Sequence, residues 1–145
     1  MRMLAIECAT EACSAALFED GVLLAGEMRV LGRGHAEALI PMIAALPGQG
    51  RAPRIVVSLG PGSFTGLRVG LAAARGLALA WRAQVLGYPT MALIAAMARA
   101  QAGAVPVSTA MSGGHGEWFL GEFGASNERL ADDRSLTPAS AAGAG

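Results

Sequence analysis

The residues with the clearest potential for chemistry form a glycine turn, Gly60-Pro61-Gly62-Ser63, which follows the short apolar run at residues 56–59. A β-branched run of this length is typical of a buried strand. Ser63 is a suitable N-cap for the helical sequence that comes next. A strand, a tight turn and a helix in this order can hold a phosphate group at the amino end of the helix. The candidate phosphate-binding residues are Gly60, Gly62, Ser63 and Thr65.

This turn matches neither of the standard phosphate-binding motifs. A P-loop requires a lysine that the turn lacks, and the dinucleotide fingerprint requires a glycine where Thr65 stands. The alternative is a tight turn that packs the following helix closely against a sheet. We favour the packing turn, and phosphate binding stays open as the second interpretation.

The titratable residues do not form a recognisable catalytic or metal-binding set. Glu7 is the only acid in the first predicted strand, and we expect it to be solvated or bonded to a backbone N–H rather than to act as a general base. His35 is followed four residues later by Leu39, so the helix presents no second histidine on the same face. His115 lies in a separate glycine-rich loop. We therefore expect no metal, no cofactor and no catalytic residue.

The helix after the turn carries a thin polar stripe. Between residues 64 and 84 the only charged residues are Arg68, Arg75 and Arg82, spaced seven apart, which places them near one line on a helix. Such a helix is covered on more than one side. Gly66 and Gly70 share a face and would let another backbone approach. We expect this helix to pack on a second helix, for which another chain is a candidate source.

The arginine stripe has two interpretations. It is either a solvated ridge that keeps an apolar helix soluble or a set of ion pairs across an interface. Arg68 lies in the first turns of the helix, where the helix dipole disfavours a cation. A nearby acid or anion would offset this, and Glu37 is one candidate.

The composition is that of a globular protein. The chain has 145 residues, 53% of them hydrophobic and 15% charged, with a formal net charge of zero. These values exclude a disordered chain and give no overall basic signal for nucleic acid. Cys8 and Cys13 are too few for a disulfide framework, and reduced thiols in the cytoplasm are the default. Glu7 and Glu11 argue against a signal peptide, and no charge-free run is long enough to span a membrane.

The predicted elements begin with three strands joined by turns, the second turn being the hairpin signal Asp20-Gly21. A polar segment at residues 127–135 and a helix-start signal at Thr137-Pro138 end the chain. We place a domain boundary near residue 103, giving one complete domain at 1–103 and part of a second at 104–145. Predicted strands are residues 2–8, 14–18, 22–28, 56–59, 84–88, 105–111 and 117–123, and predicted helices are 35–46, which contains Pro41, 64–83 and 91–102.

Four segments resemble the TsaB (YeaZ-like) family. They are residues 3–16, the run G-H-A-E-A-L-I-P at residues 34–41, the run G-P-G-S-F-T-G-L-R-V-G at residues 60–70, and G-E-W-F at residues 116–119. The run at residues 60–70 is specific to the family, and the other three segments support the resemblance. The resemblance implies an α/β chain with the actin/sugar-kinase-like (ASKHA) fold, in which two related domains occur.

The resemblance also implies a function. It predicts a non-catalytic, cytoplasmic scaffold or activator subunit that pairs with a homologous catalytic TsaD-like subunit and works with a TsaE-like ATPase. Together they would add threonylcarbamoyl to the adenosine beside the anticodon of tRNAs, with tRNA bound only through the complex. A homodimer is an alternative state. The predicted interface lies on the helices at residues 35–46 and 64–83, at His35, Leu39, Ile43, Gly66, Arg68, Gly70, Ala74 and Arg75.

Three departures from the family bear on this prediction. Residues 7–10 read Glu-Cys-Ala-Thr where the family usually has Asp-Thr-Ala-Thr, residues 108–116 lack the usual Asp-Ala-Arg type run, and the sequence stops earlier than most relatives. The rival hypothesis is an enzyme of the same fold with ATP bound at the turn of residues 60–66. A third is a self-associating structural protein.

Overall fold

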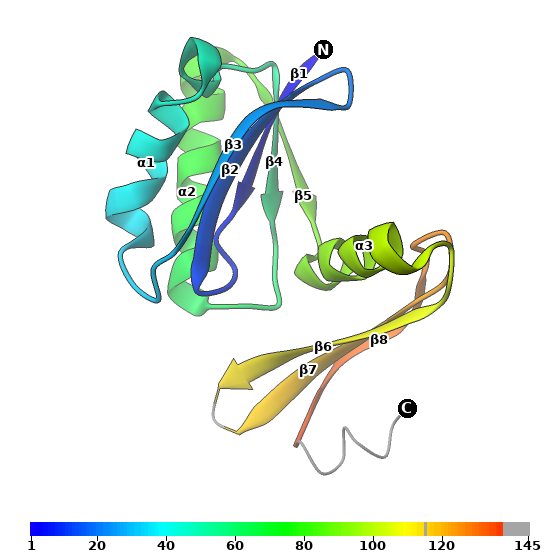
Figure 1. The fold of residues 1–145 in the computed structure, drawn as a ribbon. Helices are drawn as coiled ribbons and strands as arrows, with labels where there is room; N and C mark the ends of the chain where they lie inside the picture. The colour runs from blue at the N-terminus through cyan, green and yellow to red at the C-terminus, as the bar shows by residue number, and fades with distance from the viewer. Residues whose placement is uncertain (115, 138–145) are drawn as a thin grey trace. The chain divides into compact units, whose positions relative to one another are not determined.

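The computed structural model describes residues 1–114 and 116–137. The chain divides into two compact units, Met1–Tyr88 and Pro89–Gly145. Figure 1 shows the order of the elements along the chain. Each unit has its own sheet and its own hydrophobic core.

The first unit is built on a mixed five-stranded sheet with the strand order β3-β2-β1-β4-β5. The first three strands form an antiparallel meander, while β4 and β5 run parallel to β1. Asp20 and Gly21 close the β2–β3 hairpin with φ angles of 49° and 80°, as a type I′ turn requires, so the predicted hairpin is confirmed. The strands are β1 (Arg2–Glu7), β2 (Ala12–Glu19), β3 (Val22–Val30), β4 (Arg54–Ser58) and β5 (Gln84–Tyr88).

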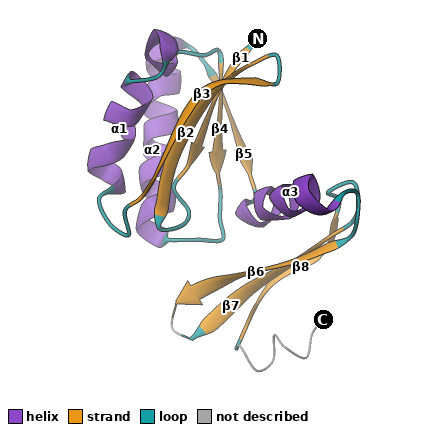
Figure 2. Cartoon of the chain, viewed as in Figure 1, coloured by secondary structure: helices purple, strands orange, loops and turns teal. Residues whose placement is uncertain are grey.

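Two helices cover one face of this sheet, α1 (His35–Ala44) and α2 (Phe64–Trp81), which lie side by side (Figure 2). A short 3-10 helix, η1 (Pro47–Gly50), follows α1. Both helices end earlier than predicted. Because alternate strand residues point to the same face, the strands and helices together bury one apolar core, formed chiefly by Leu4, Ile6, Leu17, Leu39, Met42, Ile43, Ile55, Val57 and Ala74.

The second unit pairs a helix with a three-stranded antiparallel sheet of order β6-β7-β8. Met91 and Ala95 of the helix are buried with Phe123 of the central strand. Because the buried face of this helix belongs to the second core, the units part at Tyr88, earlier than the predicted boundary near residue 103. The elements are α3 (Thr90–Ala102), β6 (Val107–Gly114), β7 (Glu117–Phe123) and β8 (Arg129–Leu136).

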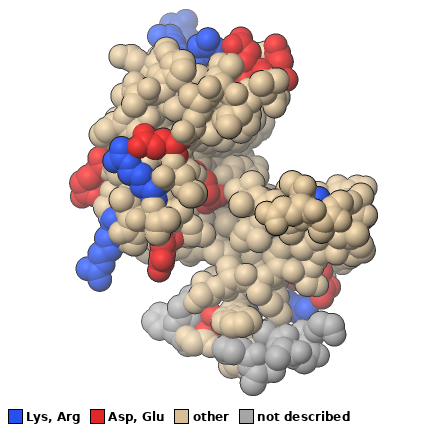
Figure 3. All heavy atoms as spheres, in the orientation of Figure 1, with Lys and Arg blue, Asp and Glu red and all other residues tan. Residues whose placement is uncertain are grey.

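The end of the chain differs from the prediction. β8 occupies sequence that the composition indicated only as polar, because a strand with one solvated face can be rich in charged residues. The helix-start signal reaches Pro138, which lies outside the described residues. Figure 3 shows charged side chains in small, separate groups on the visible face. Within the described residues, no helix combines the length and the apolar character needed to cross a lipid bilayer.

Candidate functional site: the glycine turn and the outer face of two helices

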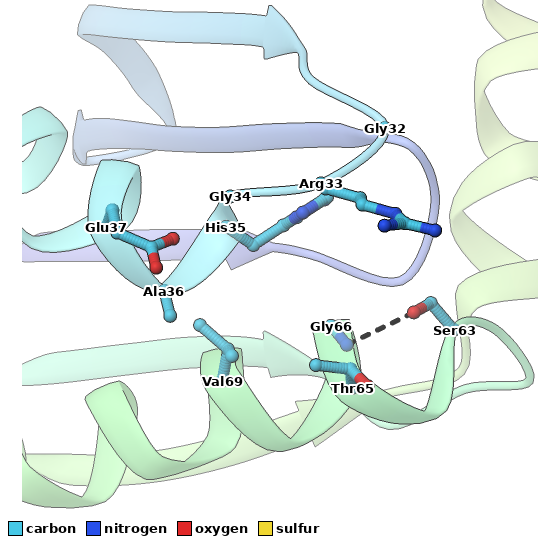
Figure 4. A pocket seen from close by; sticks show the side chains of 10 residues that line it. All are labelled: Gly32, Arg33, Gly34, His35, Ala36, Glu37, Ser63, Thr65, Gly66 and Val69. Carbon is cyan, nitrogen blue, oxygen red and sulfur yellow. Dashed lines mark hydrogen bonds between the residues drawn. The ribbon is translucent and has the colours of Figure 1, made fainter.

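The glycine turn joins β4 to α2 and is held by backbone hydrogen bonds. Ser63 caps α2 as predicted, its Oγ accepting from the N–H of Gly66 at 3.2 Å (Figure 4). The N–H of Ser63 donates to the carbonyl of Ala9 at 2.7 Å, and the N–H of Leu67 donates to the carbonyl of Ser63 at 2.9 Å. Of the first four N–H groups at the start of the helix, which a phosphate could use, those of Ser63 and Gly66 are therefore bonded within the chain itself.

The glycines of the turn are needed because the β1–β2 loop packs directly on it. A Cβ atom built at Gly62 would lie 2.4 Å from the carbonyl oxygen of Ala9, and one built at Gly66 would lie 2.0 Å from that of Cys8. Real Cβ atoms do not approach an oxygen so closely. Gly60 has a φ of +99°, a conformation that glycine adopts most readily. The turn thus binds the β1–β2 loop at the position where the sequence suggested phosphate.

The side chain of Glu7 also holds the β1–β2 loop in place. Its Oε1 accepts from the N–H of Ala9 at 2.7 Å, and its Oε2 accepts from the hydroxyl of Tyr88 at 2.8 Å. Burial raises the pKa of the Tyr88 phenol, and the nearby Glu7 carboxylate raises it further, so the phenol stays protonated and donates. Both oxygens of Glu7 have internal partners, which agrees with the expectation of an N–H-bonded acid.

His35 is a structural residue of this loop. It is 8% exposed, and its Nε2 lies 2.9 Å from the carbonyl oxygen of Thr10 and 3.3 Å from that of Ala12. Because both neighbours are acceptors, Nε2 carries the proton and donates. Among the described residues, no group of three or more His, Cys, Asp or Glu side chains could hold a metal ion. His115 lies outside those residues.

The two cysteines face each other across the base of the β1–β2 hairpin. Their Sγ atoms are 3.8 Å apart, both side chains are fully buried, and both thiols are free. Burial raises the pKa of the Cys8 thiol and of the Cys13 thiol. The pair packs as small apolar residues beneath the loop.

A cavity of about 430 Å³ opens where the amino ends of α1 and α2 converge (Figure 4). Arg33 contributes a positive charge to its lining and Glu37 a negative charge, so neither sign of charge dominates the cavity. The hydroxyl-bearing residues Ser63 and Thr65 line its α2 side. The complete lining is Gly32, Arg33, Gly34, His35, Ala36, Glu37, Ser63, Thr65, Gly66 and Val69.

Ser63→Ala removes the side-chain cap of α2 but no backbone donor. We expect the free energy of unfolding to fall by about 1 kcal/mol, the usual value for an N-cap. Thr65→Ala is the matched control and should change stability little, because Thr65 is exposed and the side-chain cap of the helix is Ser63. Chemical denaturation followed by circular dichroism measures both. Equal losses in the two variants would contradict a specific capping role for Ser63.

Six of the eight predicted interface residues are buried inside the first unit. On α1 these are His35, Leu39 and Ile43, and on α2 they are Gly66, Gly70 and Ala74. A Cβ at Gly70 would contact Cys8, Val57 and Ile6 at 3.5–3.6 Å. The glycine pair therefore admits the chain's own sheet and loop, not a helix from a partner, and the prediction for these six residues is corrected.

Arg68 and Arg75 are exposed on the opposite side of α2. Arg68 lies 4.3 Å from the ring centroid of Phe64, a cation–π contact. Among the described residues no ion pair joins Arg68 to Glu37. We call the outward surface of the two helices the helix face, and it comprises Glu37, Ile40, Ala44, Phe64, Arg68, Ala72, Arg75 and Leu79.

The helix face is unusually apolar for an exposed surface. Phe64 is 72% exposed, Leu79 is 85% exposed and Ile40 is 47% exposed. The residues of α2 on this face, at positions 64, 68, 72, 75 and 79, fall within about 80° on a helix of 3.6 residues per turn. Exposed apolar side chains interspersed with arginines on one helix surface are typical of a protein-binding surface.

The meander, the two parallel strands and the helices between them define the chain as an α/β protein of the actin-like ASKHA class. Comparisons with known proteins identify the family within this class. A family model for tRNA N6-adenosine threonylcarbamoyltransferase (TsaD) matches residues 29–144. YeaZ from Pseudomonas aeruginosa superimposes with a TM-score of 0.85 at 31% identity, covering 94% of this chain and 68% of that chain. The chain belongs to the TsaB (YeaZ-like) family.

Curated relatives agree with this assignment, and a distant structure shares the fold. The tRNA threonylcarbamoyladenosine biosynthesis protein TsaB of Escherichia coli is 38% identical over 128 residues, 85% of this chain and 55% of that protein. The chain thus spans about half the length of that relative. The TsaB of Haemophilus influenzae is 37% identical over 87 residues, 54% of this chain and 35% of that protein. The ethanolamine utilization protein EutJ from Carboxydothermus hydrogenoformans, at a TM-score of 0.52 and 10% identity over 94% of this chain and 53% of that chain, shares the fold alone.

Proposed function

We propose that this protein is a scaffold subunit in the biosynthesis of threonylcarbamoyladenosine in tRNA. It would present the helix face to a homologous, catalytic TsaD-like subunit, and a TsaE-like ATPase and tRNA would join through the complex. The observation that carries the proposal is the exposed apolar stripe of α2, in which Phe64 and Leu79 are 72% and 85% exposed. The names of the relatives supply the pathway.

The state of the glycine turn supports a scaffold over a nucleotide-binding enzyme. The N–H of Ser63 is bonded to Ala9, the N–H of Gly66 is bonded to Ser63, and both oxygens of Glu7 are bonded within the chain. A nucleotide at this turn would have to displace these contacts. The rival hypothesis, ATP bound at residues 60–66, therefore requires a rearrangement of the β1–β2 loop.

Titration calorimetry with the TsaD-like subunit from the same cell tests the proposal. We expect a stoichiometric complex, and we expect the chain alone to show little affinity for ATP and no hydrolysis of it. A chain that binds and turns over ATP in isolation would favour the rival. Failure of the two proteins to associate under any nucleotide condition would contradict the scaffold role.

A further inference from the structure

Within residues 1–114 and 116–137, no strand pairs with the outer edge of the first sheet. β3 is the last strand on its side of the sheet. The N–H of Leu31 donates to the carbonyl of Glu11 at 2.9 Å, and Val30 lies opposite Ala12. Because hydrogen-bonded and non-bonded pairs alternate in an antiparallel ladder, the N–H and C=O groups of Gly26, Met28 and Val30 point away from β2. These groups can pair with another strand.

Residues 25–31 lack two of the devices that usually keep edge strands apart, a lysine and a proline, although a bulge precedes them. Met28 is 67% exposed and Val30 is 71% exposed. The only charged residues of β3 are Glu27 and Arg29. Their side chains lie on the other face of the strand and pair with each other at 2.6 Å. The edge is therefore apolar on one face and balanced in charge on the other.

A bulge sets the length of the segment that can pair. Leu17 lies opposite Ala25 but Phe18 lies opposite Leu23, so Leu24 is an extra residue in β3. A bulge interrupts pairing and bends its strand. The regular part of the edge is thus residues 25–31, and Met28 is its centre.

We propose that a second copy of this chain pairs antiparallel with residues 25–31, with the two-fold axis at Met28. In this register Met28 meets Met28 of the second copy, and Gly26 meets Val30. On the other face Glu27 of each copy lies opposite Arg29 of the other, giving two reciprocal ion pairs. A second copy fits better than an unrelated strand because the segment, read against itself, matches each acid with a base and apolar with apolar residues.

This edge and the helix face lie on different parts of the first unit. Pairing through β3 would leave the helix face free, so one chain could hold a second copy and a different partner together. The inference does not depend on the proposed function. Loss of one interface should leave the other intact. Failure of the β3 pairing can therefore be distinguished from failure of the proposed scaffold function.

Charge reversal provides the first test, with sedimentation velocity on the whole chain over a concentration series. We expect a dimer whose dissociation constant rises at least about tenfold in Glu27→Arg and in Arg29→Glu, because each places like charges opposite one another. The double variant Glu27→Arg/Arg29→Glu should restore the dimer. Circular dichroism should show all three folded. Arg75→Glu on the helix face is the control and should leave this dimer unchanged.

Cross-linking tests the register. Met28→Cys should give a covalent dimer with a short thiol-specific cross-linker, whereas Val22→Cys should not, although Val22 is 65% exposed on the same strand. Cys8 and Cys13 are fully buried and give a low background. A wild-type chain that is monomeric throughout would overturn the proposal. A dimer broken by Arg75→Glu but not by Glu27→Arg, or equal cross-linking at both positions, would overturn it as well.

Discussion

Gly66→Ala should destabilise the first unit by about 3 kcal/mol or more, because overpacking against backbone cannot be relieved by a rotamer change. The new Cβ would lie 2.0 Å from the carbonyl oxygen of Cys8. Either the β1–β2 loop or the start of α2 must move. The fluorescence of Trp81 reports unfolding of this unit in a Trp118→Phe background, since these are the two tryptophans of the chain.

The matched control is Gly76→Ala on the same helix. A Cβ at Gly76 meets nothing within 4 Å, and the residue is exposed. Alanine is favoured over glycine in a helix by about 1 kcal/mol, so this variant should be slightly more stable than wild type. If Gly66→Ala were as stable as Gly76→Ala, the close packing of the turn on the β1–β2 loop would be wrong.

Leu79→Asp should lower the affinity for the TsaD-like subunit by about 30-fold or more, as loss of an apolar anchor does at protein interfaces. Leu79 is 85% exposed in the free chain, so the substitution should leave folding intact. Arg75→Glu should weaken the complex by a smaller factor, because an exposed charge contributes less to affinity than an apolar anchor that becomes buried. Titration calorimetry measures both affinities, and circular dichroism confirms the fold.

Leu130→Asp is the control for this prediction. Leu130 is 59% exposed on β8 of the second unit, and its substitution changes charge and hydropathy in the same way. It should leave the affinity unchanged. Equal losses in Leu79→Asp and Leu130→Asp would indicate a general effect of charge, and the assignment of the helix face would fail.

Local signals in the sequence predicted most of the first unit. The hairpin at Asp20-Gly21, the N-cap at Ser63 and the strand at residues 84–88 depend on neighbouring residues alone, and the structure places them as expected. Local patterns also predicted the order of these elements, and the family resemblance supplied the fold class. These features needed no knowledge of distant contacts.

The direction of the helix faces could not be predicted in the same way. Helical periodicity showed that Gly66 and Gly70 share a face, but it could not show that the chain's own Cys8 occupies it. The bond between Glu7 and Tyr88 joins residues 81 positions apart, so no local pattern indicates it. β8 was missed because three consecutive charged residues, at positions 132–134, break the alternation that predicts a strand. α3 was assigned to the first domain because its apolar residues give no indication of which core they enter.

Reconstituted threonylcarbamoylation of tRNA tests the central claim most directly. The assay combines the TsaD-like subunit, the TsaE-like ATPase and this chain as wild type, Leu79→Asp or Thr65→Ala, with a pull-down in parallel. The scaffold account predicts that Leu79→Asp loses complex and modified tRNA together, while Thr65→Ala retains both. Loss of modification in Thr65→Ala from a complex that still assembles would place chemistry at the glycine turn and contradict the account.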